Sequence, residues 1–289
     1  MCGRFTMLTW DETNQVARSI EAAAPFNIDP DWPAAAPACE GECGVCRNRT
    51  CSSEGGAPMR ADAFPGSRAA AVVADDGGHM AIECAVPWAK LSARMMTWGF
   101  EPIGGALGAT SGNALGTAKK AAPGTSPDAR TTAGKGGSAR GPIFNTRIET
   151  AASSPFWRDS FAGRRCIVPV AAFFEPHRNE MALGAGGRRV KQSYRFADAG
   201  GAALLLAGIW KGDRFSILTC EPDEAASPVH DRMPVALSPE AARSWLFGTQ
   251  SPNGAANIDR LGDAAPCGIA LEARPVYPAA PETGQLSLF

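Results

Sequence analysis

The sequence predicts an α+β protein in which a few helices flank an antiparallel, β-rich core. Most of the regularly patterned sequence consists of short apolar segments bounded by Gly, Asp and Pro, which is typical of strands. A helical pattern occurs only near the start and near the end of the chain. The elements therefore do not alternate in the way that a βαβ repeat requires, and we expect an antiparallel sheet.

The expected elements follow in order. A helix over 10–24 is predicted by Thr9 and Glu12, which have the spacing of a capping box. Strands are expected at 68–74, 80–84, 93–98, 166–174, 194–196, 203–210 and 214–219. A last helix is predicted from Ser238 as N-cap and Pro239 at the first helical position to about Phe247.

The chain of 289 residues is near the upper limit for one hydrophobic core. We expect one domain over 1–280, interrupted by a cysteine-rich insertion at about 38–67 and a basic loop at about 103–141. The loop is rich in Gly, Ala, Ser and Thr, a composition that buries too little apolar surface to order itself. Its excess of Lys and Arg serves either solubility or contact with a phosphate backbone. The tail, 281–289, is expected to be mobile.

Composition limits the classes of partner. The formal net charge is −1, so a nucleic-acid site would have to be a local patch. The N-terminus lacks the apolar region of a signal peptide, and the longest apolar run, 202–209, is too short to span a bilayer. Nine cysteines without a secretion signal suggest thiols in a reducing compartment. A cytoplasmic protein with no membrane contact is therefore expected.

Cys2 is the most informative residue. If Met1 is removed, Cys2 carries both a free α-amine and a thiol, with ordinary pKa values of about 7.7–8.0 and about 8.5. Such a 1,2-aminothiol attacks an aldehyde through nitrogen and then closes through sulfur to a thiazolidine. Taken alone, Cys2 could equally be an arbitrary second residue.

Further blocks resemble a known family. The chain contains Met1-Cys2-Gly3-Arg4-Phe5, Trp98-Gly99-Phe100, Asn145-Thr146-Arg147-Ile148-Glu149-Thr150, Arg164-Arg165-Cys166-Ile167-Val168-Pro169 with Phe173-Phe174-Glu175, and His230-Asp231-Arg232-Met233-Pro234. In this order they resemble the SRAP family (SOS-response-associated peptidase domain), over nearly the full length. The chain departs from the family pattern at Pro176, where Trp is usual, and at Thr146, where Ala is usual.

The resemblance implies a covalent trap for abasic sites in single-stranded DNA, in a cytoplasmic, nucleoid-associated protein. It implies that Cys2 forms the thiazolidine with the ring-opened sugar, and that Glu175 is the general acid/base. His230 would stabilise the opened sugar and shuttle protons, and Asn145 would hold the N-terminus and the sugar. The family's chemistry requires no cofactor, and removal of its own Met1 and reversal of the crosslink, as lyase-like and autopeptidase activities, are also implied.

The same resemblance suggests residues that bind DNA. Arg4, Arg147 and Arg232 would contact phosphates flanking the lesion, which suits the guanidinium fork. Trp98 would stack on a neighbouring base.

Two other functional classes stay open. A glutamine amidotransferase with an N-terminal nucleophile also begins Met-Cys-Gly, but it predicts early strands where this sequence predicts a helix. A non-catalytic, zinc-stabilised DNA-binding module would depend on the cysteine cluster instead of on Cys2.

That cluster places Cys39, Cys43, Cys46 and Cys51 within thirteen residues. Four thiolates could complete a tetrahedral Zn²⁺ site or hold an iron–sulfur cluster. Structural zinc sites usually place a longer loop between two ligand pairs, so free or redox-labile thiols are the third alternative.

The last five residues, Gln285-Leu286-Ser287-Leu288-Phe289, resemble the short peptide by which bacterial repair proteins and polymerases bind the DNA sliding clamp. Leu286, Leu288 and Phe289 would enter an apolar pocket, and Gln285 would set the register. The alternative is that the three apolar residues pack back on the domain as a last strand.

Overall fold

The computed structural model describes residues 2–28, 60–74, 91–102, 141–184, 187–247 and 269–278. The described elements are, in chain order, β1 (Arg4–Met7), α1 (Trp10–Glu21), β2 (Asp62–Ala63), β3 (Arg68–Ala74), β4 (Leu91–Trp98), β5 (Asn145–Arg147), α2 (Ile148–Ala151), α3 (Arg158–Gly163), β6 (Arg165–Leu183), β7 (Arg189–Asp198), β8 (Leu204–Lys211), β9 (Arg214–Cys220), β10 (Met233–Pro234), β11 (Ala236–Leu237), α4 (Pro239–Phe247) and β12 (Leu271–Pro275). The expected α+β class is confirmed.

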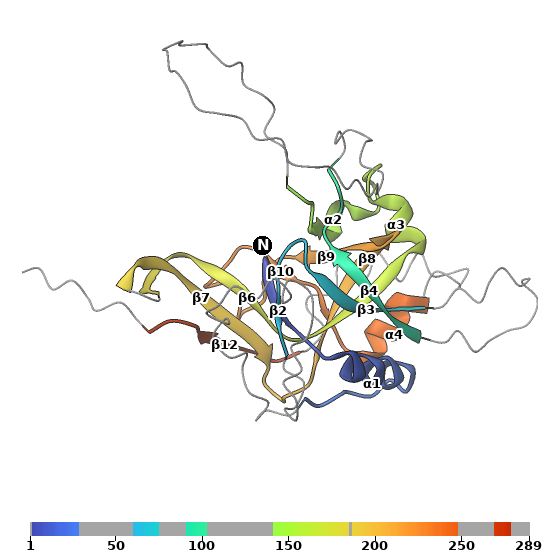
Figure 1. Cartoon of the computed structure of the whole chain (residues 1–289), viewed down its shortest axis with the longest axis horizontal. Coiled ribbons are helices and arrows are strands. Elements are labelled where there is room, and N and C mark those ends of the chain that lie inside the picture. The colour runs from blue at the N-terminus through green and yellow to red at the C-terminus, as the bar shows by residue number, and fades with distance from the viewer. Residues whose placement is uncertain are drawn as a thin grey trace, which may run out of the picture.

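The strands pair mostly antiparallel and close into a ring. β8 pairs with β9, β9 with β4, β4 with β3, β3 with β6, and β6 again with β8. Strands β4 and β5 lie parallel to β9, and the other pairings are antiparallel. Figure 1 shows this sheet at the centre, with α1 and α4 at one end and the hairpin of β6 and β7 extending from the other.

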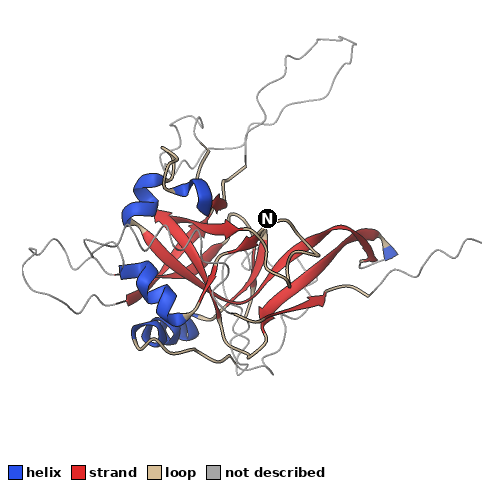
Figure 2. Ribbon diagram, turned by 180° about the vertical axis from the view of Figure 1, so that it is seen from behind, coloured by secondary structure: helices blue, strands red, loops and turns tan. Residues whose placement is uncertain are grey.

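Side chains of the ring alternate between two apolar clusters, as the two-residue repeat of a strand requires. In β6, Cys166 and Val168 join one cluster, which also contains Phe5 and Trp98, whereas Ile167 joins the other. The second cluster is covered by helices, which Figure 2 shows gathered on one side of the sheet. Burial on both faces explains why β6 is apolar without alternation from Cys166 to Phe174.

The predicted elements agree with the structure over the described residues, with differences at their ends. Helix α1 begins at the capping box of Thr9 and Glu12 but stops at Glu21 instead of residue 24. Ala23 adopts a left-handed φ of 52°, and the N–H groups of Ala23 and Ala24 bond back to Ile20 and Ser19, which ends the helix in a Schellman motif.

Strand β6 is much longer than predicted. It continues past Pro176 to Leu183, because β7 pairs with it beyond an irregularity between Pro176 and Met181. A proline is tolerated at such a break in the ladder. The expected strand at 80–84 lies outside the described residues. No helix in the described part of the chain is long and apolar enough to cross a membrane.

Candidate functional site

The N-terminal strand brings Cys2 to the middle of β6. Strand β1 pairs antiparallel with β6, with Arg4 opposite Phe174. The N-terminal segment that carries Cys2 therefore lies beside the part of β6 that carries Glu175. Cys2 is buried, and its Sγ lies 3.5 Å from the Arg4 carbonyl oxygen. Burial, together with the negative charge of Glu175, raises the pKa of the Cys2 thiol well above its ordinary value. The thiol is therefore neutral at physiological pH.

Asn145 connects β5 to the N-terminal segment. Its Nδ2 donates a hydrogen bond to the Cys2 carbonyl oxygen at 2.8 Å. Its Oδ1 is buried and has no hydrogen-bond partner among the described residues. Asn145 thus holds the residue after Met1 in place and retains an acceptor, which can take a hydrogen bond from an N–H or O–H group.

Glu175 is the central ionisable group of the site. Its side chain is fully buried on β6, and burial raises the pKa of this carboxyl to about 7. The positive charge of the chain's amino terminus opposes the shift, and the negative charge of Asp231 adds to it. A carboxyl that titrates near neutrality can both donate and accept a proton under physiological conditions.

His230 faces Glu175 from the loop before β10. Its Nε2 lies 4.0 Å from Glu175 Oε2, and burial is the main cause that lowers its pKa below the ordinary value. Nδ1 lies 3.1 Å from the Arg232 backbone N–H and 2.9 Å from Asp231 Oδ1. When Nδ1 accepts from Arg232, the ring proton is on Nε2, which can then only donate. When Nδ1 carries the proton and donates to Asp231, in the neutral and in the protonated ring alike, Nε2 can take and return a proton.

Two of the three predicted phosphate-binding arginines are accessible. Arg147 is exposed, and its side chain forms no hydrogen bond or ion pair with the described residues; it lies two positions after Asn145 on β5. Arg4 is half-buried, lies over the Phe174 ring at 4.1 Å, and donates from Nε and Nη2 to Asp62 Oδ2.

The third, Arg232, requires a correction. Its Nη1 and Nη2 donate to the two carboxylate oxygens of Glu149 at 2.7 and 2.9 Å, and Nη2 also donates to the Thr219 carbonyl oxygen at 2.6 Å. Only 12% of its side chain is exposed. In this structure the guanidinium of Arg232 is occupied by Glu149 and Thr219 and is not presented to solvent as expected. Arg232 instead ties the loop of His230 to the segment that follows Asn145.

The prediction that Trp98 stacks on a base is also wrong. Trp98 has no exposed surface; it packs between Phe5 and Phe215 and donates from Nε1 to the Phe144 carbonyl oxygen. A base cannot stack on a ring whose faces are covered. Gly99, next in the motif, has a φ of +112°, and a Cβ there would lie 2.8 Å from the Pro142 Cβ, so only glycine fits.

The structure offers an exposed aromatic that sequence reasoning missed. Phe64 is 52% exposed and follows Ala63, the partner of Phe5, so the antiparallel register carries it toward Arg4. It opens a tight turn in which the Ser67 N–H bonds to the Phe64 carbonyl oxygen. Pro65 and Gly66, whose φ is +93°, occupy the positions that a type II turn requires. The Phe-Pro-Gly-Ser sequence was the available signal.

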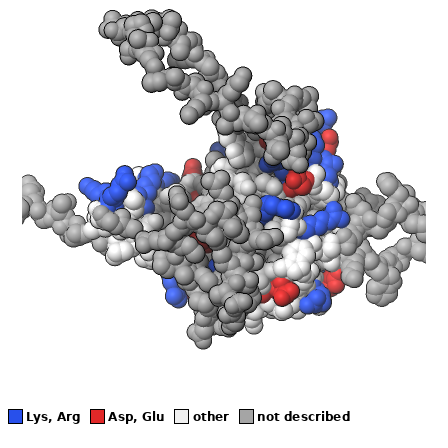
Figure 3. Space-filling view, viewed as in Figure 1, with Lys and Arg blue, Asp and Glu red and all other residues white. Residues whose placement is uncertain are grey.

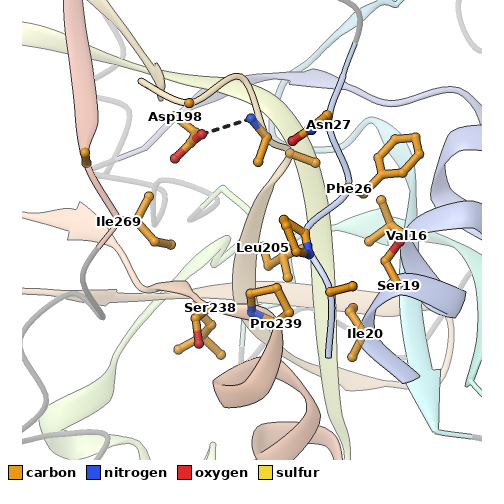
Figure 4. Close-up of a pocket in the computed structure, with 17 residues that line it drawn as sticks. Val16, Ser19, Ile20, Phe26, Asn27, Asp198, Leu205, Ser238, Pro239 and Ile269 are labelled. Carbon is orange, nitrogen blue, oxygen red and sulfur yellow. Dashed lines mark hydrogen bonds between the residues drawn. The ribbon is translucent and has the colours of Figure 1, made fainter. Parts of the chain in front are cut away.

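A separate cavity of about 460 Å³ lies between α1, the end of β7 and the start of α4 (Figure 4). None of the predicted site residues lines it. Its polar side chains serve local structure: Asp198 accepts the Ala202 N–H, Ser238 accepts the Ala241 N–H, and Ser19 donates to the Gln15 carbonyl oxygen. The cavity therefore offers apolar surface without a reactive pair.

Several predicted sites lie outside the described residues, so they stay predictions. These are the cysteine cluster at 39–51, the basic loop and the clamp-binding tail at 285–289. Within the described residues, no three His, Cys, Asp or Glu side chains are grouped to hold a metal ion.

Fold and site together define a class of protein. It is an α+β protein whose second residue, a cysteine, lies beside a histidine and a carboxyl group whose pKa is about 7. The family model for SOS response associated peptidase (SRAP) matches residues 1–279, and the chain belongs to this family. The resemblance inferred from the sequence motifs is thereby confirmed.

Relatives in the curated proteins carry informative names. One is the abasic site processing protein YobE of Bacillus subtilis (strain 168), 34% identical over 111 residues, which is 36% of this chain and 48% of that protein. Another is the abasic site processing protein YedK of Escherichia coli (strain K12), 32% identical over 129 residues, which is 42% of this chain and 54% of that protein. The chain thus spans about half the length of the curated relatives it matches.

Solved structures support the fold. A phage-related protein from Bordetella bronchiseptica has a TM-score of 0.51 at 21% identity and covers 95% of this chain and 94% of its own. A second protein from the same organism has a TM-score of 0.51 at 21% identity and covers 96% and 100%.

Proposed function

We propose that this protein binds single-stranded DNA at abasic sites and forms a covalent crosslink through Cys2 after Met1 has been removed. The observation that carries the proposal is the convergence of Cys2, Asn145, Glu175 and His230 from four separate parts of the chain. Relatives named as abasic site processing proteins support the choice of DNA lesion. Because the proposed substrate is chromosomal DNA, we expect the protein to act in the cytoplasm, in association with the nucleoid.

The reaction begins with the amine. The ring-opened abasic sugar exposes an aldehyde at C1′, and the α-amine of Cys2 adds to it to give a carbinolamine. Glu175, protonated in part near neutrality, donates a proton to the departing hydroxyl, so that water leaves and an imine forms. The buried, neutral Cys2 thiol does not compete at this stage.

Ring closure follows from the thiol. Cys2 Sγ adds to the imine carbon, forming the C–S bond, while the thiol proton passes through the Glu175 carboxylate to the imine nitrogen. The product is a thiazolidine, and the overall reaction releases one water. His230 takes and returns protons at Nε2 during opening of the sugar ring, and the same groups acting in reverse would release the crosslink and account for a lyase-like activity. The same site would also account for autopeptidase removal of Met1.

DNA contacts are assigned to the accessible groups. Arg147 and Arg4 bind phosphates on either side of the lesion, and Phe64, in place of Trp98, stacks on a neighbouring base. Arg232 acts indirectly by holding the loop of His230 through Glu149.

The test uses a single-stranded oligonucleotide with one abasic site, analysed by denaturing gel and intact mass. We expect a heat-stable adduct whose mass equals the protein without Met1 plus the DNA minus one water. Cys2→Ala should abolish it, and Cys220→Ala, the same change at a half-buried cysteine of β9, should leave it intact.

The proposal would be overturned if protein whose mass confirms removal of Met1 formed no adduct. Release of ammonia from glutamine that needs Cys2 would favour the amidotransferase. DNA binding that survives Cys2→Ala but is lost on replacing Cys39, Cys43, Cys46 and Cys51 would favour the zinc-stabilised module.

A further inference from the structure

The outer part of the β6–β7 hairpin, residues 176–193, forms an arm that projects from the body of the protein (Figures 1 and 2). At its root Glu175 pairs with Tyr194, and beyond it Met181, Ala182 and Leu183 pair with Lys191, Val190 and Arg189. Strand β12 pairs with β7 only from Tyr194 to Asp198, and Val276 and Tyr277, which follow it, hydrogen-bond with Ser193 and Gln192. Within the described residues, this segment therefore covers only the root of the arm.

The arm carries a strong local positive charge. Arg178, Arg188, Arg189 and Lys191 are all exposed. The one acid in 176–193 is Glu180, whose Oε2 accepts a hydrogen bond from the Tyr194 hydroxyl at 2.7 Å. Lys and Arg side chains gather over the arm in Figure 3. Because the whole chain has a formal net charge of −1, this charge belongs to the arm and not to the protein in general.

The exposed side chains of the arm favour a polyanion as its binding partner. The exposed large apolar side chains of the described residues are Trp10, Phe64 and Met95, and none of them lies on the arm. A surface of exposed cations without apolar anchors is suited to phosphates and poorly suited to a protein partner.

The root of the arm is tied to the catalytic loop. The Arg178 N–H donates to the Val229 carbonyl oxygen at 3.1 Å, and Arg178 Nη2 donates to the Ser227 carbonyl oxygen at 2.8 Å. Val229 immediately precedes His230. The position of the arm relative to the site is therefore set by these contacts, and DNA held at the site would run beside it.

Strand geometry gives the reach of the arm. At about 3.3 Å per residue, Lys191 and Arg189 lie about 10 and 17 Å along β7 from Tyr194, the partner of Glu175. Duplex DNA has about 3.4 Å per phosphate along one strand, and an extended single strand has a longer spacing, so these distances correspond to at most about three to five nucleotides.

We propose that the arm is a second DNA-binding surface, on which Arg188, Arg189 and Lys191 bind backbone phosphates of the same strand within about five nucleotides of the reacting sugar. The proposal rests on the function proposed above. Phosphate contacts carry no base information, so the arm adds affinity and orientation on the strand without adding sequence preference.

The test measures equilibrium binding to a single-stranded oligonucleotide with a central, unreactive tetrahydrofuran analogue of the abasic site. The variant R188Q/R189Q/K191Q is compared with R18Q/K211Q/R243Q, which removes the same charge from exposed positions elsewhere. Arg18 and Arg243 lie on α1 and α4. Lys211 lies beyond Ile209, the partner of Arg165 at the start of β6, whereas Glu175 lies in the middle of that strand.

On a long oligonucleotide, R188Q/R189Q/K191Q loses three phosphate contacts. The plot of log K against log salt should therefore become shallower by about 2, and binding should weaken about tenfold or more. On a trinucleotide, which has one nucleotide on each side of the analogue and ends before the arm, the arm variant and the wild type should bind alike. The double variant R188K/R189K, which keeps the charge of both arginines and leaves Lys191 in place, should preserve the slope. Circular dichroism checks that each variant is folded.

An arm variant that matches the control variant on the long oligonucleotide overturns the proposal. This failure is distinct from failure of the proposed function. If the wild type forms a Cys2-dependent adduct but the arm variant keeps the salt slope of the wild type, only the proposed role of the arm is wrong. If the wild type forms no adduct, the proposed crosslinking function is wrong.

Discussion

At the scale of single residues, burial acts on two neighbouring ionisable groups in opposite directions. It raises the pKa of Glu175 to about 7 and lowers the pKa of His230. The charged form of each group is disfavoured, so a carboxylic acid and a neutral imidazole face one another near neutral pH. One group is thereby able to donate a proton while the other accepts one, as acid–base chemistry on a sugar requires.

Asp231 should tune both groups. Its negative charge raises the pKa of Glu175 and the pKa of His230, so Asp231→Asn lowers both. We expect the pH profile of adduct formation, measured as initial rate, to move to lower pH. The shift should be modest because 69% of the Asp231 side chain is exposed and its charge is screened.

Asp213→Asn, at an exposed turn position after β8, provides the control and should leave the profile in place. A shift to higher pH in Asp231→Asn, or the same profile in both variants, would contradict this account.

Phe64 gives a prediction about binding. If its exposed ring stacks on a base, Phe64→Ala should weaken binding to the unreactive abasic oligonucleotide by about 1–3 kcal/mol, or at least about fivefold. Trp10→Ala removes a comparably exposed aromatic from the start of α1 and should not change the affinity. Equal effects of the two variants, measured by fluorescence anisotropy, would exclude a stacking role.

At the scale of elements, two segments that carry site residues are locked together. β5 and α2 carry Asn145 and Glu149, and the loop before β10 carries His230 and Arg232. The two-pronged pair of Arg232 with Glu149 joins them, and the hydrogen bonds from Arg232 lower the pKa of Glu149, which keeps it ionised. Secondary structure alone would leave the loop of His230 free to move.

Glu149→Gln should therefore lower the free energy of unfolding by about 1–2 kcal/mol, since a charge-assisted, half-buried pair is lost. It should also slow adduct formation at saturating DNA, because His230 is held less firmly. Glu272→Gln breaks an exposed pair with Arg274 and should do neither. Urea unfolding and single-turnover gel assays measure the two effects; a slower adduct with no loss of stability would point to direct DNA contact by Glu149.

At the scale of the whole molecule, the closed ring of strands creates the dry environment of the site. Its side chains are buried on both faces, and Glu175 lies where that burial ends. A carboxyl placed there costs stability whenever it is ionised. The fold thus maintains a reactive group at the expense of its own stability.

This cost depends on pH in a defined direction. The folded-state pKa of Glu175, about 7, exceeds its ordinary value of 4.5, so the folded protein binds the proton more tightly than the unfolded chain does. The contribution to stability is fully present below pH 4.5 and is lost as the pH rises to about 7, by up to about 3 kcal/mol. Glu175→Gln removes the titration.

Urea unfolding at pH 4.5 and pH 8 measures this change in the free energy of unfolding. The stability of the wild type relative to Glu175→Gln should fall between these pH values, whereas Glu224→Gln, at an exposed position, should track the wild type. A constant difference between wild type and Glu175→Gln would show that burial does not raise this pKa.

The sequence by itself determined the class of fold and most of the site. Apolar runs bounded by Gly and Pro, a capping box and a Ser-Pro helix start are local signals, and they correctly located β3, β9, α4 and the start of α1. The ordered motifs that resemble the SRAP family named Cys2, Asn145, Glu175 and His230 as candidate site residues, and the structure brings these four residues together.

Only the tertiary structure decided burial and partnership. Trp98 looked available and is core, Arg232 looked free and is held by Glu149, and Phe64 looked ordinary and is exposed. The arm became visible only when β6 proved to continue past Pro176. The physical reason is that such properties depend on contacts between distant parts of the chain. Asn145 meets Cys2 across 143 positions and Arg232 meets Glu149 across 83, and no local pattern encodes either contact.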